Sequence, residues 1–545
     1  MGKIKVISNP YENIIEYQRW NEEEGKWKNI DNVNSRLQKE ELIKGFLPFI
    51  AKEIIDTIVS EYMTTDEMLE IVFEGADDEY KELASICSKS GYENVAVKRS
   101  DRYLENARDI FPDIVGIFEQ IKPLISESIQ EDPGVKRNLE NFSDVSKDLI
   151  PICVLGNYST GKSTFINALV GWELLANSDE PLTARVYSII KSRFPDRARI
   201  RFNVGEDKVN IRFDEDKYRI DCDEGHEVVD TLKSRLANEN QEDMLSKISS
   251  ALSYLNVVKD GVISDLIEIE VPFNAGLWNT SKYQFVIFDT PGSNSTSNTK
   301  HMEVLREAMK NLTNGLPVFV SEYNTLDSKD NESLHKELRT MEGLDSRFTM
   351  IIVNKADKAS LPKGGFSEDA VDRILNETLP KNLYSEGIFF VSSILGLGSK
   401  IKGEFVDDNY AEIYETEKTK YSDPESRFYK KLFAYNIMPE QIKEAATVSA
   451  GKCEDLIFAN SGLYSVEEEI QKFAQKYSPY NKCQQSKKFL GEVIDRTTEL
   501  LEEKKQHSEA SKQSLIRNME RDKADRKSTR LNSSHTTVSR MPSSA

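Results

Sequence analysis

Cysteine and histidine are scarce in this sequence, with five of each among 545 residues. No two cysteines stand in a CxxC pair, and the histidines do not cluster. Structural zinc sites and disulfide frameworks need several such residues at short, regular spacings. The sequence therefore predicts neither a zinc site nor a disulfide scaffold, and its scattered thiols are typical of a protein in the reducing cytosol.

Long apolar runs and an excess of positive charge are lacking too. No run approaches the roughly 18 apolar residues of a membrane-spanning helix, and the first residues have no signal-peptide core. The net charge of −20 is opposite to the basic surface that nucleic-acid binding requires. We therefore expect a cytoplasmic protein that binds no nucleic acid and contacts a membrane only peripherally.

The first 148 residues divide into two parts. Residues 1–100 begin with a polar and aromatic stretch of weak periodicity. They then contain apolar segments at 71–73 and 95–97 around a helical stretch, which predicts a small βαβ unit. Residues 101–148 have helical apolar spacing, which Pro112 and Pro123 should break, and the sequence DPG at 132–134 indicates a turn.

From residue 149 onward, strand-like and helix-like segments alternate. Near-continuous apolar runs are typical of parallel strands buried on both faces. The strand-like segments are PICVLG, ARIRFNV, VNIRFD, LIEIEVPF, YQFVIFD, LPVFVSEY, FTMIIVNK and GIFFVSS, and helices are expected at 162–170, 302–311 and 331–341. This rhythm predicts an α/β domain at 149–480 built on a doubly wound, mainly parallel sheet and flanked by helical regions.

The last part of the chain is expected to start a long helix at 481–524. About 40 residues without a break exceed the usual range of globular helices, so a stalk or coiled coil is predicted. The segment 525–545, DRKSTRLNSSHTTVSRMPSSA, is rich in Ser, Thr and Arg and has no apolar period. It resembles a translated sequencing-library adapter. We expect a non-native tail there, with the native stalk cut near Ala524.

A phosphate-binding pattern, GxxxxGK[ST], follows the first strand of the α/β domain. Its glycines allow backbone N–H groups to close around phosphates, its lysine places a charge beside the β- and γ-phosphates, and its serine offers a hydroxyl to Mg²⁺. The strand before it and the helix after it are the context that such a loop requires. The predicted nucleotide-binding residues of this loop are Gly156, Asn157, Tyr158, Ser159, Thr160, Gly161, Lys162, Ser163 and Thr164.

Two further motifs follow strands of the same predicted sheet. In DTPG, Asp289 at the end of a buried strand can hold the Mg²⁺ shell, and Gly292 can donate its backbone N–H to the γ-phosphate. In NKAD, the Asp357 carboxylate can accept hydrogen bonds from the N1–H and exocyclic amine of guanine, which adenine lacks in that geometry. Lys355 has a stem suited to the face of the base, and Asn354 can tie this loop to the phosphate loop. The predicted ligand is therefore GTP or GDP.

These motifs, in this order at strand ends, resemble a P-loop GTPase of the TRAFAC type and, more narrowly, the dynamin family of large GTPases, bacterial members included. Ser392 and Ser393 follow the last strand, where such proteins have a loop that contacts guanine through its backbone. Ser159 stands where dynamin-like proteins help to hold a monovalent cation, K⁺ or Na⁺, that neutralises charge in the transition state.

The segment SDEPLTARVYSI at 178–189 resembles the switch I region of dynamin-like proteins. This makes Thr183 the candidate water-positioning residue and a ligand of Mg²⁺ together with Ser163 and Asp289. For Arg185, a catalytic part and a surface position beside a strand both remain open.

The resemblance covers about residues 149–480 and implies hydrolysis of GTP to GDP and phosphate, with Ser159, Lys162 and Thr183 acting on the γ-phosphate. It also implies a homodimer or higher oligomer formed through the nucleotide-binding face, coupled to membrane remodelling. Because no basic or long apolar segment for membrane insertion stands out, the alternative is a regulatory GTP switch that acts on protein partners. A P-loop ATPase with a helical arm is the third interpretation, and NKAD argues against it.

Overall fold

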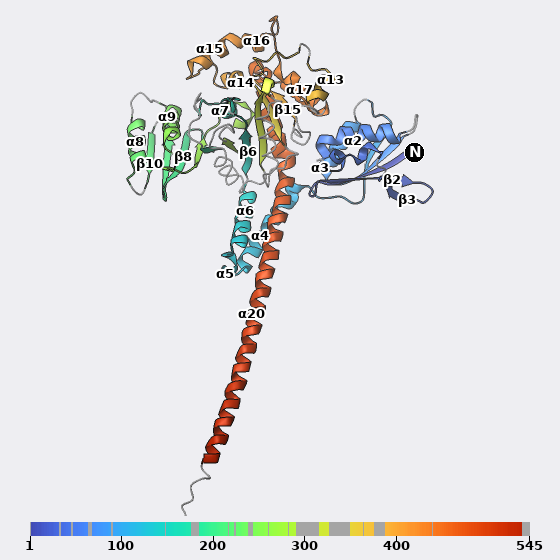
Figure 1. Ribbon diagram of the computed structural model, residues 1–545. Coiled ribbons are helices and arrows are strands. Elements are labelled where there is room, and N and C mark those ends of the chain that lie inside the picture. Colours follow the sequence, from blue (N-terminus) through green and yellow to red (C-terminus); the bar gives the residue numbers. More distant parts are fainter. Residues whose placement is uncertain are drawn as a thin grey trace, which may run out of the picture. The chain divides into compact units, whose positions relative to one another are not determined.

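A computed structural model gives the structure of the chain (Figure 1). It describes all residues except 1, 32–33, 45–46, 64–67, 89–90, 148, 158, 176–184, 216, 223–224, 238–242, 260, 282, 290–314, 326–348, 363–364, 375–386, 439 and 537–545. The chain forms two compact units, of which one comprises residues 1–115 and 143–486 and the other residues 116–142 and 487–545. The predicted helices at 302–311 and 331–341 lie outside the described residues.

The N-terminal part contains a five-stranded sheet in the order β3-β2-β1-β4-β5. The predicted βαβ unit is confirmed, with β4 (Leu69–Glu74) parallel to β5 (Val95–Arg99) and α3 (Asp77–Cys87) between them. Helices α1 (Glu40–Ile43) and α2 (Leu47–Tyr62) precede it. Figure 1 shows α2 and α3 on one face of this sheet.

Three further strands of this sheet were not predicted: β1 (Gly2–Asn9), β2 (Ile14–Asn21) and β3 (Lys26–Asn29). In β1, Ile4 and Val6 point into the core while Lys3 and Lys5 alternate with them on the opposite face. A half-covered strand has this period of two. Only the buried face of such a strand is apolar. The polar residues between the apolar ones therefore make the strand hard to recognise in the sequence.

The second sheet has ten strands in the order β10-β9-β8-β11-β7-β12-β6-β13-β14-β15. All eight predicted strand segments contain strands of this sheet, whereas β7 and β10 were not assigned as strands from the sequence. The strand bounds are β6 Leu149–Leu155, β7 Val186–Lys191, β8 Arg197–Val204, β9 Asp207–Asp214, β10 Lys217–Asp221, β11 Leu266–Val271, β12 Gln284–Asp289, β13 Leu316–Glu322, β14 Met350–Asn354 and β15 Ile388–Phe390. Strands β12, β6, β13, β14 and β15 run parallel, and β8, β9 and β10 form an antiparallel extension.

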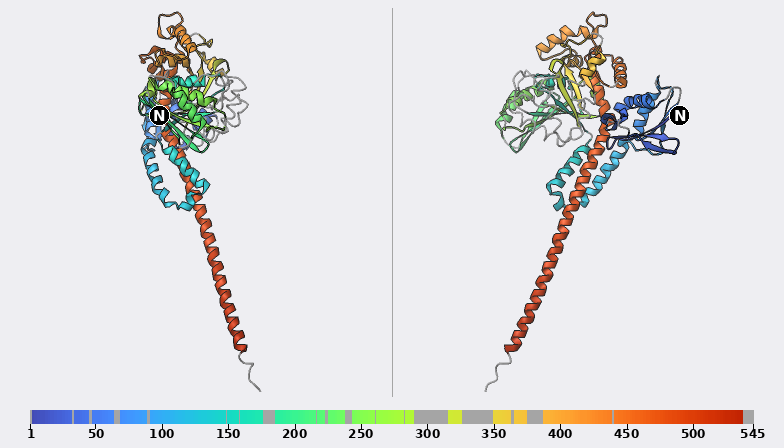
Figure 2. Two further views of the ribbon diagram at one scale, coloured as in Figure 1. Left: turned by 90° about the vertical axis from the view of Figure 1, so that its left-hand side faces the viewer. Right: turned by 45° about the vertical axis from the view of Figure 1, so that its right-hand side comes forward.

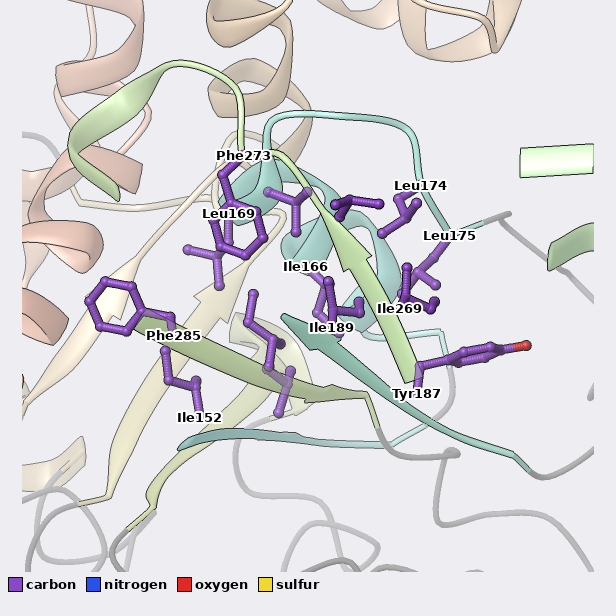
Figure 3. Close-up of a cluster of buried hydrophobic side chains, with 14 of the residues drawn as sticks. Ile152, Ile166, Leu169, Leu174, Leu175, Tyr187, Ile189, Ile269, Phe273 and Phe285 are labelled. Carbon is purple, nitrogen blue, oxygen red and sulfur yellow. The ribbon is translucent and has the colours of Figure 1, made fainter. Parts of the chain in front are cut away.

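Both faces of the parallel half are buried. On β6, Ile152 and Val154 belong to one apolar cluster, and the alternate residues Cys153 and Leu155 belong to another. Figure 3 shows the first cluster, in which Ile152 and Ile166 lie among residues of several strands. This burial explains the near-continuous apolar runs, since a strand covered on both faces has no side for polar residues.

The helices of this region have the predicted type where they were predicted. Helix α7, expected at 162–170, spans Lys162–Val170. The other helices are α8 Glu227–Leu236, α9 Met244–Val257, α10 Gly276–Asn279, α13 Glu368–Arg373, α14 Ser393–Lys400, α15 Asp408–Glu417, α16 Thr419–Ser422, α17 Glu440–Ala450, α18 Leu456–Asn460 and α19 Leu463–Lys472.

The break expected at Pro123 is confirmed, because α4 (Ala107–Ile121) ends before the 3₁₀ turn η2 (Lys122–Leu124) that contains this proline. The break expected at Pro112 is wrong, because Pro112 lies inside α4. The turn expected at 132–134 is also wrong. The sequence at 132–134 starts a helix, because Asp132 Oδ1 accepts hydrogen bonds from the backbone of Gly134 at 3.0 Å and of Val135 at 3.2 Å. An aspartate before a proline at the first helical position is a strong start signal, and α6 spans Pro133–Ser146.

The C-terminal helix α20 spans Ser478–Thr536, and both views of Figure 2 show it as one long helix. It begins slightly before the predicted start at 481 and continues into the segment from 525. Within its own unit, Arg496 forms an ion pair with Asp132 at 3.1 Å, and Phe118 stacks on Phe142. Among the described residues, no helix combines the length and apolar character that crossing a membrane demands.

Candidate nucleotide-binding site

The turn between β6 and α7 has a backbone that only glycine can adopt at its two ends. Gly156 has a φ of 151° and Gly161 a φ of 81°. A Cβ atom on Gly156 would lie 2.3 Å from the Val320 carbonyl oxygen, and one on Gly161 would lie 2.5 Å from Asn354 Nδ2. The turn therefore packs directly on β13 and on the end of β14, with its backbone free to follow a phosphate chain.

Lys162, the first residue of α7, is buried inside this turn. Its ammonium donates hydrogen bonds to the carbonyl oxygens of Gly156 at 2.8 Å and Asn157 at 3.0 Å. Burial lowers the pKa of Lys162, while the carboxylate of Asp289 acts in the opposite direction. Thr160 Oγ1 also donates to the Asn157 carbonyl, at 2.8 Å. The lysine is thus held at the centre of the loop, where a phosphate would be bound.

Asn354, the last residue of β14, joins three loops. Its Nδ2 donates to the carbonyl oxygens of Thr160 at 3.1 Å and Gly161 at 3.3 Å. Its Oδ1 accepts from the backbone N–H of Ser393 at 3.2 Å and from the Ser393 hydroxyl at 2.7 Å. The tie that the sequence suggested for Asn354 is therefore present, and it extends to the loop after β15.

Lys355 reaches back across the phosphate loop. Its ammonium donates to the Ser159 carbonyl oxygen at 2.6 Å and forms an ion pair with Glu322, the last residue of β13, at 2.5 Å. Both Lys355 and Ser159 have left-handed backbones, with φ of 54° and 64°. The lysine stem consequently spans from the loop after β14 to the phosphate loop.

Asp357 is partly exposed at the same edge of the sheet. Lys430 donates to its backbone carbonyl at 3.3 Å. Its carboxylate accepts no hydrogen bond from the part of the chain that the structure describes, so both oxygens are available to a ligand. The side chain therefore lies in the same loop as Asn354 and Lys355.

Ser392, Ser393 and Thr164 are buried parts of the supporting structure. The Ser392 backbone N–H donates to the Ser461 carbonyl at 2.9 Å, and Ser393 is held by Asn354 as described. Thr164 pairs its hydroxyl with that of Tyr410 at 2.9 Å. The side chains of Ser393 and Thr164 thus contact neighbouring elements, and the backbone N–H groups of Ser392 and Ser393 are paired within the protein.

The candidate Mg²⁺ ligands are only partly described. Ser163 lies in the first turn of α7, and Asp289 ends β12 close enough to influence the pKa of Lys162. A hydroxyl and a carboxylate are the oxygen donors that Mg²⁺ prefers beside substrate phosphates, so these two residues fit that ion. When bound there, Mg²⁺ would neutralise charge on the phosphates. Tyr158, Thr183 and Gly292 lie outside the described residues.

Arg185 occupies neither of the two positions left open by the sequence. It is buried, and its guanidinium donates to the carbonyl oxygens of Leu255, Val258 and Lys259, the distance to Val258 being 2.6 Å. These carbonyls end α9, where a positive charge complements the helix dipole. Arg185 therefore anchors the start of β7 to α9 and is not a surface residue.

Two supporting residues were missed in the sequence. Glu322 pairs with Lys355, and Tyr410 pairs with Thr164, although neither belongs to a motif. The available signal for Glu322 was its position, since a charged residue ends the apolar strand LPVFVSE. No comparable signal marked Tyr410, whose partner lies on a distant helix.

The region that contains these loops is similar to a known protein family. Residues 152–356 match the profile of the dynamin family. This stretch contains the phosphate loop, Asp289 and Asn354. This region of the chain is therefore similar to the dynamin family.

Individual relatives match over shorter or more divergent regions. A bacterial dynamin-like protein of Nostoc punctiforme is 33% identical over 94 residues, which are 16% of this chain and 13% of that protein. Two solved structures of an oligomerised bacterial dynamin pair, described as sensing and tethering membranes, have TM-scores of 0.34 and 0.28. They are 15% and 14% identical, and each alignment covers 85% of this chain and 58% of the other. The chain thus spans little more than half the length of those proteins.

Proposed function

We propose that this chain binds GTP between the phosphate loop and the Asn354–Asp357 loop and hydrolyses it to GDP and phosphate. The observation that carries the proposal is the position of Asn354, which hydrogen-bonds both the phosphate loop and Ser393. One side chain thereby holds the phosphate and base loops at the same sheet edge. The dynamin-family match over these residues supports the same assignment.

The proposed reaction is in-line attack of water on the γ-phosphate, for which positioning and charge stabilisation supply most of the acceleration. Lys162 would exchange its contacts with the Gly156 and Asn157 carbonyls for the β- and γ-phosphates. In this proposal Thr183 orients the water through its backbone. Ser159 would help to hold a K⁺ or Na⁺ ion, which would neutralise charge in the transition state.

The proposal extends to assembly. We infer that two copies meet across the nucleotide-binding face, that this contact raises the rate of hydrolysis, and that the protein acts at a membrane surface as a peripheral protein. The support is the family match, together with a relative that is described as bacterial dynamin-like. Coupling turnover to dimerisation would convert GTP hydrolysis into a cycle of membrane remodelling.

The test is the GTPase rate per molecule of the full chain, measured over a hundredfold range of protein concentration with and without anionic liposomes. We expect the rate per molecule to rise with concentration and again with liposomes, and excess ATP to leave it unchanged. Inhibition by ATP equal to that by unlabelled GTP would remove the guanine assignment. A rate independent of protein concentration would remove the dimerisation step.

A second candidate function is a regulatory GTP switch acting on protein partners. For such a switch, the liposome titration would leave the rate flat while guanine specificity is retained. The same experiment therefore separates the two functions.

A further inference from the structure

A tyrosine hydroxyl next to the proposed guanine site lacks a partner. Tyr421, in the short helix α16, is fully buried with 0% of its surface exposed. Among the described residues, nothing forms a hydrogen bond with its hydroxyl. Two other buried tyrosines have partners, since Tyr17 donates to the Leu42 carbonyl and Tyr480 to Asp78, each at 2.7 Å. A buried hydroxyl without a partner carries a free-energy cost, so its retention points to a partner in another state.

The backbone around Tyr421 is firmly held. Its carbonyl oxygen accepts a hydrogen bond from Asn460 Nδ2 at 2.8 Å, and its N–H donates to the Lys418 carbonyl at 3.0 Å. The ring packs in the same apolar cluster as Ala356, the residue that precedes Asp357. The hydroxyl is therefore fixed in position, unlike that of a surface tyrosine.

Asp357 directly follows Ala356, and its charge acts on the Tyr421 hydroxyl. After burial, the negative charge of Asp357 is the next cause that raises the pKa of Tyr421. Lys430 links the two segments, because its side chain donates to the Asp357 carbonyl and its backbone N–H donates to the Lys420 carbonyl at 2.8 Å. The residue before Tyr421 is thus tied to the loop that carries Asp357.

We propose that, when a guanine nucleotide binds, the Tyr421 hydroxyl donates a hydrogen bond to the Asp357 carboxylate and so positions it for the base. This inference rests on the guanine site proposed above. A carboxylate has about four lone-pair positions, so two can face the N1–H and exocyclic amine of guanine while another accepts from Tyr421. Tyr421 is a positioning residue in this arrangement, since it acts on the ligand through Asp357.

The test compares the full-length wild-type chain with Tyr421→Phe, which keeps the ring and removes only the hydroxyl. Equilibrium binding of GDP and of IDP is measured by titration calorimetry; IDP retains the N1–H of guanine and lacks the exocyclic amine. We expect GDP affinity to fall about tenfold, as for loss of one hydrogen bond to a charged group. IDP affinity should fall less, because its single contact needs less precise placement of the carboxylate.

Ser465→Ala is the matched control. Ser465 lies on α19, is 0% exposed and also has a hydroxyl without a partner among the described residues. Both variants should unfold thermally at or slightly above the wild-type temperature without nucleotide, because each loses a buried unsatisfied group. Only Tyr421→Phe should lose GDP affinity, and in an Asp357→Ala background it should cause no further loss.

Three results would overturn the inference: wild-type GDP affinity in Tyr421→Phe, equal weakening of GDP and IDP, or further weakening in the Asp357→Ala background. The second would mark Tyr421 as a packing residue only, and the third would mark a direct contact with the base. If the wild-type chain itself binds no GDP, the proposed function fails first, and this inference fails with it.

Discussion

Two strand–turn–helix units of this chain have the same topology and opposite chemistry. In the N-terminal sheet β4 leads into α3, and in the large sheet β6 leads into α7. The first turn of α3 carries Asp77, Asp78 and Glu79, and Glu79 accepts the Ala76 backbone N–H at 3.1 Å. The first turn of α7 carries no acidic residue and begins with Lys162.

The difference shows what turns a helix start into an anion site. Every helix has unpaired N–H groups and a partial positive charge at its start. In α3 the charges of Asp77 and Asp78 and the hydrogen bond from the Ala76 N–H to Glu79 offset both, and a phosphate would be repelled. In α7 the glycines keep the turn open and Lys162 adds positive charge, so the same topology is left ready for a phosphate.

Replacing the lysine of α7 should have the largest effect. We expect Lys162→Ala to abolish detectable GTP binding, a loss of at least about a thousandfold, because the charge beside the β- and γ-phosphates is removed. Lys81→Ala is the matched control, since Lys81 is exposed in α3 and pairs with Asp77. Titration calorimetry measures both, and a Lys162→Ala protein that hydrolysed GTP at the wild-type rate would refute the site assignment.

A single substitution at Asp357 should change which nucleotide base the proposed site prefers. Asp357→Asn should shift the preference from GTP towards XTP by about a hundredfold, because the amide donates where the carboxylate accepted. The exposed Asp369 of α13 gives the control Asp369→Asn, which should leave the preference unchanged. Competition binding with the two nucleotides measures the ratio. An unaltered preference for GTP in Asp357→Asn would remove Asp357 from the base contact.

An asparagine contacts each of the two turns: Asn354 the turn before α7 and Asn106 the turn before α3. Replacing Asn354 should have the larger effect on stability and on GTP affinity. Asn354→Ala should lower GTP affinity about tenfold and destabilise the fold by about 2–4 kcal/mol, because it leaves buried carbonyl and N–H groups unpaired. Asn106 is half-buried and accepts the Asp78 N–H beside α3 at the longer distance of 3.3 Å, so Asn106→Ala should cost less stability than Asn354→Ala and leave GTP affinity unchanged. Urea unfolding and calorimetry give both quantities. Equal effects of the two variants on GTP affinity would contradict the comparison.

The smallest expected effect concerns pH and the α3 turn. Burial raises the pKa of Glu79 from about 4.5 to about 8, and Asp78 adds to the shift. The unfolded chain releases this proton near pH 4.5, so the stability of the N-terminal sheet should fall as pH rises from about 4.5 to about 8.

Glu79→Gln keeps an acceptor for the Ala76 N–H and cannot ionise, so it should flatten this pH dependence without changing GTP affinity. The urea midpoint at pH 5.5, 6.5 and 8 measures it in both proteins. An equally steep decline in Glu79→Gln would show that Glu79 is not the titrating group.

Much of the site could be predicted because its motifs are local. An apolar strand followed by GxxxxGK[ST] specifies the turn and the helix start together, and NKAD after the next apolar strands specifies the base. Strands β1 and β2 were missed because only alternate residues of each are buried, and β3 was missed because it has four residues and buries none. The prediction that Pro112 breaks the helix was wrong because a proline can remain inside a helix whose apolar face is packed, as in α4.

The sequence by itself determined the chemical groups of the site, because Gly156, Gly161, Lys162 and Asp357 act through local backbone freedom and charge. Only the tertiary structure decided which distant residues support them. Asn354 and Thr160 are 194 positions apart, and Arg185 and Val258 are 73 apart. No local period records such contacts, since a polar side chain is buried only where packing supplies a partner for each of its hydrogen-bonding groups.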